Sequence, residues 1–314
     1  MILIWGLPAD PPIGAVAEAL ERRHAPFLLL NQQLALETSI ELHVGDRVCG
    51  EISIGGQKHA VEDIKAAYLR PHDSRRLPNV AAQGEGSPNW QHAVGLEDSL
   101  LMWSEITSAL VVSRPRAMAT NGSKPYQSAY ARARGFMTPE TLITSDRDAA
   151  LAFWEHHKDV IYKSTSGIRS IVARLTASHR LRFEHLECCP TQFQQYVPGD
   201  DYRVHVVDGD CFASKILSDA DDYRYAQRQG GSDIDVRSHE LDDETTDRCR
   251  LLASDLNLPV AGIDLRQTPD GTWYCFEVNP SPGFTFYENW TGQPIADAVA
   301  RLLETGAVRA APVS

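Results

Sequence analysis

The sequence has few cysteines and no arrangement of them that indicates a zinc centre or a disulfide framework. Its six cysteines include no CxxC pair and no metal-type spacing. The only close pair, Cys188 and Cys189, is adjacent in sequence and poorly placed to bridge. This usage is typical of reduced thiols, so we expect a cytoplasmic protein.

Long apolar runs and an excess of positive charge are also missing. No stretch approaches the length of a membrane span, and the apolar run at residues 1–5 is too short for a signal peptide. The net charge is −12, whereas a nucleic-acid binder needs a basic face to neutralise phosphates. We therefore expect neither a membrane nor a nucleic acid as a partner.

Several common catalytic signatures are missing as well. Gly6 and Gly14 do not form a GxGxxG fingerprint, and the small loop at residues 164–167 joins two strands instead of opening a helix, as a P-loop would. No convincing Ser-His-Asp or Cys-His set is present. What remains is chemistry that works through positioning and charge stabilisation.

The hydrophobic pattern predicts an α/β protein with more than one lobe. A chain of 314 residues usually divides into two or three lobes. Residues 2–30 alternate strand, helix and strand, a typical opening of an α/β lobe, and residues 111–112 form its expected last strand. After this lobe we expect helices at 124–134, capped by Ser123, and at 146–157, capped by Ser145, with strands at 141–144, 160–163, 171–175, 191–197, 202–207, 210–217, 261–267 and 272–278.

The strongest chemical pattern lies on the last predicted hairpin. Asp264 is on one arm and Glu277 on the other, and Asn279 shares a strand face with Glu277 because side chains alternate along a strand. Both arms are otherwise apolar, where an unpaired carboxylate is costly. Three oxygen ligands on one sheet face suit hard Mg²⁺ (or Mn²⁺) ions that bridge phosphates. The alternative is a hairpin whose carboxylates face solvent.

Four cations precede this hairpin, namely Lys124, Lys163, Arg203 and Lys215. Any one of them alone could be an ordinary lysine or arginine whose charged end reaches solvent. Together with metal ions they would form a clamp for a triphosphate, because positive charge offsets the charge that develops on a transferred phosphoryl group.

These motifs, in this order, resemble the ATP-grasp superfamily and most of all the RimK-type carboxylate–amine ligases. The resemblance covers roughly residues 110–305 and is strongest at 260–283, at 192–203 and at the loop 222–231. It implies an ATP-grasp fold of the α/β (α+β) class. The expected parts are a pre-ATP-grasp α/β domain (1–112) and an ATP-grasp domain (113–306), with a lid subdomain at about 140–195, a C-terminal antiparallel-sheet subdomain at about 196–306, and a tail (307–314).

The resemblance also implies roles for individual residues. ATP would be bound by Lys124, Lys163, Gln194, Gln195, Tyr196, Val197, Asp201, Arg203 and Lys215. Within that set Arg203 and Lys215 would act on the phosphates or the acyl-phosphate, and Asp264, Glu277 and Asn279 would hold Mg²⁺. Two positions depart from the family pattern: Gln195 stands where the hinge often has Glu, and the lid loop is short of glycine.

A weaker resemblance links the chain to graspetide peptide ligases. It rests on residues 284–295, with Arg70 as a possible substrate-facing arginine, although an arginine that closes a strand is often only an ion-pair partner. Arg224, Arg228 and Arg266 are further candidates for binding a carboxylate-bearing substrate, because a guanidinium grips carboxylates through two parallel hydrogen bonds.

The expected activity is ATP-dependent amide bond formation between a carboxylate and an amine, through an acyl-phosphate. The substrates would be amino acids or peptides, including ribosomal precursor peptides, and a homo-oligomer is compatible with the resemblance. Two other classes stay open: a phosphotransferase that uses the same clamp, and a non-catalytic nucleotide sensor. The intact set of Asp264, Glu277 and Asn279 argues against the sensor.

Overall fold

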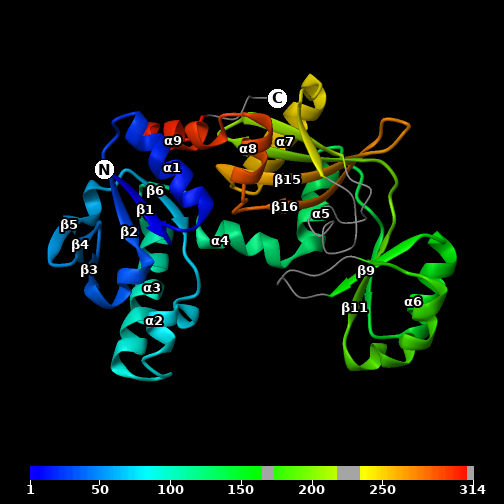
Figure 1. Cartoon of the computed structure of the whole chain (residues 1–314), viewed down its shortest axis with the longest axis horizontal. Helices are drawn as coiled ribbons and strands as arrows, with labels where there is room; N and C mark the ends of the chain where they lie inside the picture. Colours follow the sequence, from blue (N-terminus) through cyan, green and yellow to red (C-terminus); the bar gives the residue numbers. More distant parts are fainter. Residues whose placement is uncertain (165–172, 218–233, 310–314) are drawn as a thin grey trace.

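The computed structural model describes residues 1–164, 173–217 and 234–309. Figure 1 shows three lobes: the first lobe on the left, the C-terminal sheet at the upper right and a lid at the lower right. Helix α4 (Pro115–Met118), the 3₁₀ segment Ala119–Gly122 and helix α5 (Lys124–Ala133) lead from the first lobe to the rest. The expected α/β class with an ATP-grasp arrangement of sheets is confirmed.

The first lobe is built on a four-stranded parallel sheet in the order β2-β1-β6-β7. Alternate residues of β1 point to opposite faces, so Ile2 and Ile4 pack toward α1 while Leu3 and Trp5 pack toward α3. The elements are β1 (Ile2–Gly6), α1 (Pro11–Arg22), β2 (Phe27–Asn31), β6 (Ala66–Arg70), α2 (Pro78–Ala81), α3 (Pro88–Ile106) and β7 (Leu110–Val112).

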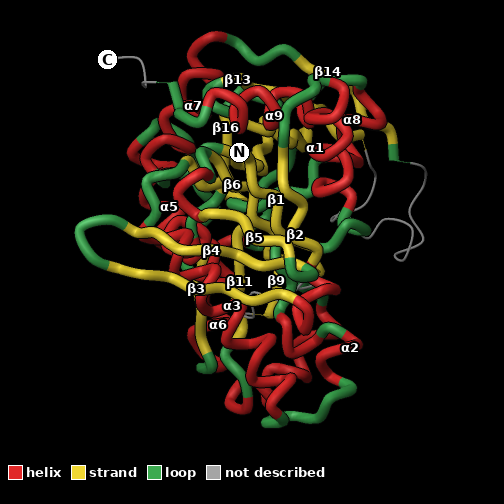
Figure 2. Tube along the Cα trace, turned by 90° about the vertical axis from the view of Figure 1, so that its left-hand side faces the viewer, coloured by secondary structure: helices red, strands yellow, loops and turns green. Residues whose placement is uncertain are grey.

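A small antiparallel sheet extends from the first lobe. It consists of β3 (Thr38–Val44), β4 (Val48–Ile54) and β5 (Gln57–Ala60), and Figure 2 shows the β3–β4 turn projecting from the body. Strands β3 and β4 form an antiparallel hairpin that turns at Gly45, and β5 adds a third strand. Short 3₁₀ segments flank this sheet and the end of β6: Gln32–Glu37, Val61–Asp63 and Ser74–Arg76.

The lid is an antiparallel sheet in the order β10-β9-β11-β8 with helix α6 against it. Its elements are β8 (Thr141–Thr144), α6 (Arg147–His157), β9 (Val160–Ser164), β10 (Ala173–Arg174), the 3₁₀ segment Ala177–Cys188 and β11 (Thr191–Gln195). The predicted cap Ser145 is wrong. Asp146 caps α6, because its carboxylate accepts a hydrogen bond from the Ala149 amide at 2.7 Å.

The C-terminal subdomain is a five-stranded antiparallel sheet in the order β14-β13-β12-β15-β16. One face packs on α5 and α7 through apolar side chains that alternate along the strands, such as Val204, Ile263 and Val278. The opposite face carries the polar residues. The elements are β12 (Asp200–Val207), β13 (Asp210–Leu217), β14 (Asp235–His239), α7 (Asp243–Asp255), β15 (Val260–Gln267), β16 (Trp273–Asn279), α8 (Thr285–Thr291) and α9 (Ile295–Thr305).

The first lobe and the C-terminal sheet share one core. Helix α9 returns to pack beside α1, as Figure 1 shows at the upper left, and Val299 and Leu302 join Ile13 and Val16 in a buried cluster. Val207, at the end of β12, belongs to the same cluster. This packing holds the first lobe in a defined position beside the polar face of the C-terminal sheet.

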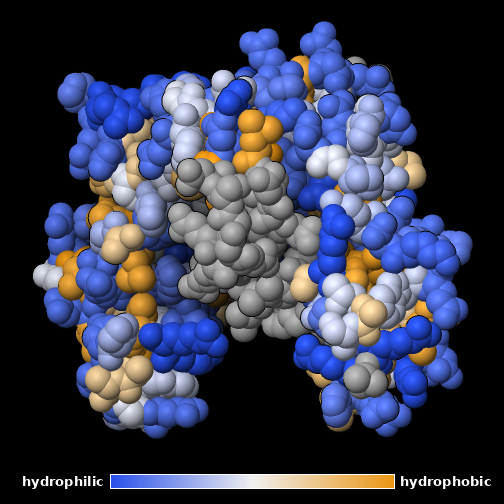
Figure 3. All heavy atoms as spheres, turned by 45° about the vertical axis from the view of Figure 1, so that its right-hand side comes forward, coloured by the Kyte–Doolittle hydropathy of each residue, from blue (hydrophilic) through white to orange (hydrophobic). Residues whose placement is uncertain are grey.

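The surface is mostly hydrophilic on the face shown in Figure 3, where the first lobe and the lid form two limbs that separate at the bottom of the view. All six cysteines are free thiols. Among the described helices, none combines the length and the apolar character that crossing a membrane requires.

Candidate active site

A row of charged side chains crosses three neighbouring strands of the C-terminal sheet. Arg203 on β12 lies directly opposite Asp264 on β15, and Asp264 lies opposite Glu277 on β16. Directly opposed residues share a sheet face, so the three side chains stand side by side on the face away from α7. We call Arg203, Asp264, Glu277 and Lys124, which contacts Glu277, the charged row.

Two ion pairs order the charged row. Arg203 Nη1 lies 2.5 Å from Asp264 Oδ1, and Lys124 Nζ lies 2.5 Å from Glu277 Oε1. Lys124 also donates to Asn121 Oδ1 at 3.0 Å. Arg203 is only 6% exposed, whereas the Asp264 and Glu277 side chains keep 23% and 26% of their surface in solvent. The carboxylates are thus oriented by buried or half-buried cations and remain open to a ligand.

Gly262 makes room for the buried end of Arg203. A Cβ built on Gly262 would lie 2.3 Å from Arg203 Nη2 and 2.8 Å from Pro282 Cβ. Glycine inside a strand often marks such a close approach. Gly262 also lies opposite Asn279, whose Oδ1 accepts the Ser281 amide at 2.9 Å. The loop that follows β16 is therefore folded back over the charged row.

The side chain of Gln127 fastens α5 to the edge strand β16. Its Nε2 donates to the Val278 carbonyl at 2.6 Å, and its Oε1 accepts the Val278 amide at 3.2 Å. Gln127 is 3% exposed, so it satisfies two buried backbone groups that would otherwise lack partners. It lies one turn after Lys124 and holds that lysine beside Glu277.

Gln127→Leu is expected to lower the free energy of unfolding by about 1–3 kcal/mol, because the backbone polar groups of Val278 lose their buried partner. Urea denaturation measures the loss. Gln57→Leu, the same change at an exposed site on β5, is the matched control and is expected to be nearly neutral. Equal effects of the two substitutions would contradict the role given to Gln127.

His205 lies beside Arg203 on the same strand face. It is fully buried among Phe284, Tyr287 and Arg203, and burial, helped by the nearby Arg203 charge, lowers its pKa well below the ordinary value. A neutral imidazole can accept a hydrogen bond, and Arg203 Nε lies 3.5 Å from His205 Nε2. His205 therefore supports the guanidinium without adding a second charge.

A cavity of about 420 Å³ opens between the lid and the C-terminal sheet. Lys124 contributes from the charged row, Lys163 and Gln194 from the lid, and Phe276 from β16. Lys163 pairs with Gln192 across β9 and β11, so both face the cavity with Gln194. The volume lies within the range of small-molecule sites. Gln192 is a lining residue that the sequence analysis missed.

The hinge between the lid and the C-terminal sheet is held by Arg266. Its guanidinium forms a two-point pair with Asp201, at 2.7 and 2.8 Å, and donates to the Val197 carbonyl at 2.7 Å. It also lies 5.9 Å from the ring of Tyr196. Gln195 is tied to the lid through backbone and side-chain bonds with Glu140. These contacts place Arg266 beside Tyr196 and Val197, which the resemblance assigns to ATP binding.

Lys215 is not brought to the charged row. It lies opposite Tyr202, which points to the other face from Arg203, and its Nζ is 2.6 Å from Asp200 Oδ2. The hydrogen bond to Asp200 raises the pKa of Lys215. The sequence pattern placed Lys215 on β13 correctly, and the two-residue turn at Asp208 and Gly209 sets it opposite Tyr202 and therefore on the other face from Arg203.

Arg70 connects the first lobe to the loop that follows β16. Its Nε pairs with Asp10 at 2.6 Å, while Nη1 donates to Ser281 Oγ at 2.8 Å and to the Pro282 carbonyl at 3.1 Å. Its substrate-binding role stays a prediction, and these contacts favour holding the loop. Arg224 and Arg228 lie outside the described residues.

Asp264 and Glu277 of the charged row, together with Asn279, form a set of oxygen donors that fits a divalent metal ion. Asp264, Glu277 and Asn279 present carboxylate and amide oxygens on one sheet face, and such hard oxygen donors are the ligands that Mg²⁺ prefers. The two carboxylates are directly opposed across β15 and β16, next to the cavity-lining Lys124. A cavity between two antiparallel sheets, beside oxygen donors and cations, defines a class of protein that binds a nucleotide together with a metal ion.

Comparisons with known proteins identify the family within this class. The model of the RimK-like ATP-grasp domain matches residues 127–303, more than half of the chain, and the chain belongs to this family. Glutathione synthetase of Escherichia coli (strain K12) is 26% identical over 125 residues. That match covers 35% of this chain and 37% of the synthetase, so the chain spans well under half of this curated relative.

Solved structures of peptide ligases resemble the whole chain. The ATP-grasp ligase PsnB, complexed with a phosphomimetic variant of a minimal precursor, Mg and ADP, is 27% identical, with a TM-score of 0.80 over 97% of this chain and 98% of PsnB. The macrocyclase MdnC from Microcystis aeruginosa MRC, bound to its precursor peptide MdnA, is 22% identical, with a TM-score of 0.80 over 97% of this chain and 99% of MdnC. At that identity MdnC supports the fold alone.

Proposed function

We propose that this protein is an ATP-dependent ligase that joins a carboxylate and an amine of peptide substrates through an acyl-phosphate, releasing ADP and phosphate. The charged row beside the cavity is the observation that carries the proposal. Phosphoryl transfer needs positive charge around the transferred group more than it needs a side-chain nucleophile. Arg203 and Lys124 bring positive charge to the site, and their pairing with Asp264 and Glu277 fixes where that charge lies.

In the proposed first step, a substrate carboxylate oxygen attacks the γ-phosphorus of ATP, and the bond to the β,γ-bridging oxygen breaks to release ADP. Lys124 and Lys163, which line the cavity, would contact the phosphates. Asp264, Glu277 and Asn279 would hold Mg²⁺, which, when bound, neutralises phosphate charge. Arg203, fixed against Asp264, would face the oxygens that gain charge.

In the second step, an amine attacks the acyl carbon, inorganic phosphate leaves with the former carboxylate oxygen, and the amine loses a proton. This route forms one amide and consumes one ATP. Water would compete with the amine for the acyl-phosphate. The first lobe, held beside the charged row through Arg70 and the loop at Ser281 and Pro282, is positioned to exclude it.

A peptide is the substrate class best supported. The solved structure of PsnB, at 27% identity over nearly the full chain, is a complex with a phosphomimetic variant of a minimal precursor. The structure of a RiPP-associated ATP-grasp ligase from Chryseobacterium gregarium, which has the same fold at 22% identity and a TM-score of 0.81, is a complex with ADP and a leader and core peptide. Glutathione synthetase, matched over a shorter segment, extends the candidates to small peptides and amino acids.

The test is incubation with ATP, Mg²⁺ and a library of peptides that carry aspartate or glutamate together with lysine. ADP release is measured, and the masses of the peptide products are determined in parallel. The proposal predicts ADP formation that depends on peptide, with products that have lost one water per bond. Stable phosphorylated products would support the phosphotransferase instead. Peptide-independent nucleotide binding without any turnover across the library would support the sensor.

Asp201→Asn is expected to raise the KM for ATP by about tenfold, which corresponds to about 1.4 kcal/mol, and to change kcat little. The substitution weakens the two-point pair with Arg266, whose guanidinium also holds the Val197 carbonyl at the hinge. Steady-state kinetics of ADP release measure the split between KM and kcat. Asp235→Asn removes the exposed pair with Arg237 and is the control that should change neither. A matching loss in both variants would contradict the hinge role.

A further inference from the structure

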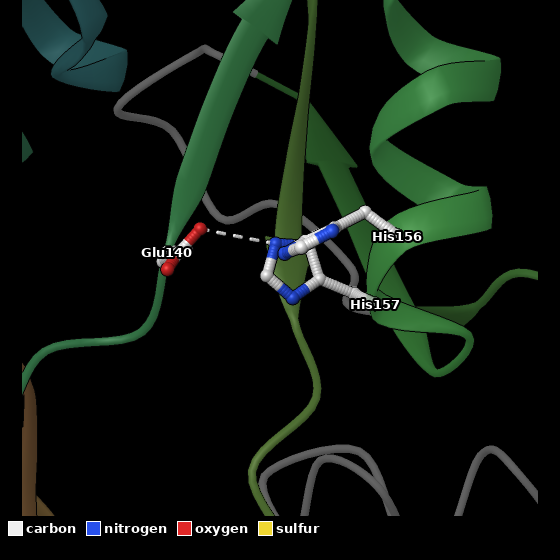
Figure 4. Close-up of side chains that lie close together, drawn as sticks. All are labelled: Glu140, His156 and His157. Carbon is white, nitrogen blue, oxygen red and sulfur yellow. Dashed lines mark ion pairs between the residues drawn. The ribbon is translucent and has the colours of Figure 1, made fainter.

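Two adjacent histidines and a glutamate meet at one edge of the lid. His156 and His157 end helix α6, and Glu140 lies just before β8 (Figure 4). One ligand atom from each of the three side chains can be chosen so that all lie within 4.8 Å of one another. Neighbouring helical residues usually point about 100° apart. Here the helix ends at His157, and the two imidazole rings lie 4.7 Å apart, edge to face.

The buried imidazole nitrogen Nε2 of His157 forms an ion-pair contact with Glu140 but no hydrogen bond within the described part of the chain. Its side chain is 8% exposed, and Nε2 makes no hydrogen bond to any residue that the structure describes, although Glu140 Oε2 lies 3.2 Å away. Buried polar atoms without a hydrogen bond are rare in folded proteins, and a missing ion is one explanation for them. In Figure 4 this nitrogen faces Glu140 and the ring of His156.

We propose that His156, His157 and Glu140 form a second metal site, which takes a borderline transition-metal ion such as Zn²⁺ and is separate from the Mg²⁺ site of the charged row. Imidazole nitrogens with one carboxylate oxygen are typical ligands of Zn²⁺, whereas Mg²⁺ selects oxygen sets. Three protein ligands leave one position for water.

The site can close around an ion without moving its buried member. Ligand atoms about 2.1 Å from a shared ion lie at most about 4.2 Å apart, so the 4.8 Å set has to contract slightly. His156 and Glu140 are exposed and free to rotate toward the ion, whereas His157 is fixed by packing against Phe153, with ring centroids 4.4 Å apart. The site is thus anchored on one buried ligand.

A simpler interpretation of the histidine pair is complementarity to the negative end of the helix dipole. That interpretation requires only a cation near the end of α6 and places no demand on Glu140. An ion pair between His157 and Glu140 would account for the 3.2 Å contact as well. The metal site differs from both in measurable terms, because it alone binds Zn²⁺ and requires His156 as well as Glu140.

An ion here would link the lid helix to the hinge. Glu140 is paired with Gln195 through two backbone-linked bonds: its carbonyl accepts the Gln195 amide at 2.9 Å and its amide donates to the Gln195 side chain at 3.3 Å. Binding at Glu140 would therefore join the end of α6 to β8 and to the last residue of β11. This inference does not depend on the ligase activity.

The experiment is calorimetric titration of the full chain with Zn²⁺ in excess Mg²⁺, without nucleotide. Wild type is expected to bind one equivalent at this site. Glu140→Gln and His156→Asn, both at exposed positions, are expected to weaken binding by about tenfold or more. Hydrogen exchange with saturating Zn²⁺ should slow at the end of α6 and in β8 of wild type, and not in either variant.

Two controls separate this site from other donors. His185→Asn, on the same lid, and the double change Cys188→Ser with Cys189→Ser remove exposed donors elsewhere and should leave the titration unchanged. Zn²⁺ binding that survives Glu140→Gln and His156→Asn at wild-type strength would overturn the proposal. Binding that disappears with the cysteines would overturn it as well.

Discussion

Asp264→Asn is expected to lower the rate of ADP release by at least about a hundredfold, the loss that follows removal of one preorganised charged contact at a reacting group. The residue stands in the middle of the charged row, opposite Glu277 and paired with Arg203 at 2.5 Å. The change removes the charge of a proposed metal ligand. It also leaves Arg203, which is 6% exposed, opposite a neutral amide.

The matched control for this prediction is Asp270→Asn, at the exposed turn of the same hairpin. Asp270 bonds only within that turn, to Thr268 and Thr272, among the residues described. It should retain nearly full turnover. Circular dichroism of both variants checks the fold. Asp264→Asn with wild-type rates of ADP release would remove Asp264 from the account of catalysis.

Gly262→Ala is expected to combine a loss of stability with a loss of turnover. Its new Cβ would meet Arg203 Nη2 at 2.3 Å and Pro282 Cβ at 2.8 Å, distances that atoms do not tolerate. Overpacking of this kind costs about 1–3 kcal/mol. Either the guanidinium leaves Asp264 or the loop that carries Pro282 moves, and in both cases turnover should fall by about tenfold or more.

Gly95→Ala tests whether a methyl group as such is harmful. Gly95 lies in α3. A Cβ built on it meets no atom within 4 Å apart from its chain neighbours and the backbone of its own helix, so this change should be neutral or slightly stabilising. Thermal unfolding and ADP release are measured on both variants. If Gly262→Ala keeps the stability and the turnover of wild type, Arg203 is not held against Gly262 in solution.

The central part of the site could be predicted from the sequence because its oxygen ligands lie on the two arms of one hairpin. Asp264 and Glu277 lie on two arms of one hairpin with a short turn, and Asn279 is two residues from Glu277. The structure places Asp264 and Glu277 directly opposite each other. Alternation alone gives the shared face of Glu277 and Asn279. Asp264 joins them on that face because the pairing of the two arms shifts by one residue between Leu265 and Asp264, which the sequence does not show.

Features that depend on packing between distant segments could not be predicted from the sequence. The position of Lys215 is not among them, because the two-residue turn at Asp208 and Gly209 already sets Lys215 opposite Tyr202. The hydrogen bond from the Gln127 side chain to the Val278 carbonyl joins residues 151 positions apart. Gly262 is an exception, because a glycine within an apolar strand indicates that another group approaches the backbone closely there.

Capping and short elements account for the other differences. Ser145 and Asp146 are both good caps, and one residue decides which of them begins α6. Strand β14 and helix α8 were not predicted, because β14 is a short edge strand and the residues of α8 are a mixture of aromatic and polar types without a clear period. The sequence shows no metal-type spacing for His156 and His157, because Glu140 lies 16 positions before the pair.

The most direct test of the central claim is the thermal midpoint of wild type and Asp264→Asn, each with and without ATP and Mg²⁺. A ligand that binds only the folded state stabilises it by about 2.7 kcal/mol at a hundred times its Kd. The account predicts a clear rise in the wild-type midpoint that requires both ATP and Mg²⁺, and a much smaller rise in Asp264→Asn. An equal rise in the two proteins, or no rise in wild type at millimolar nucleotide, would contradict it.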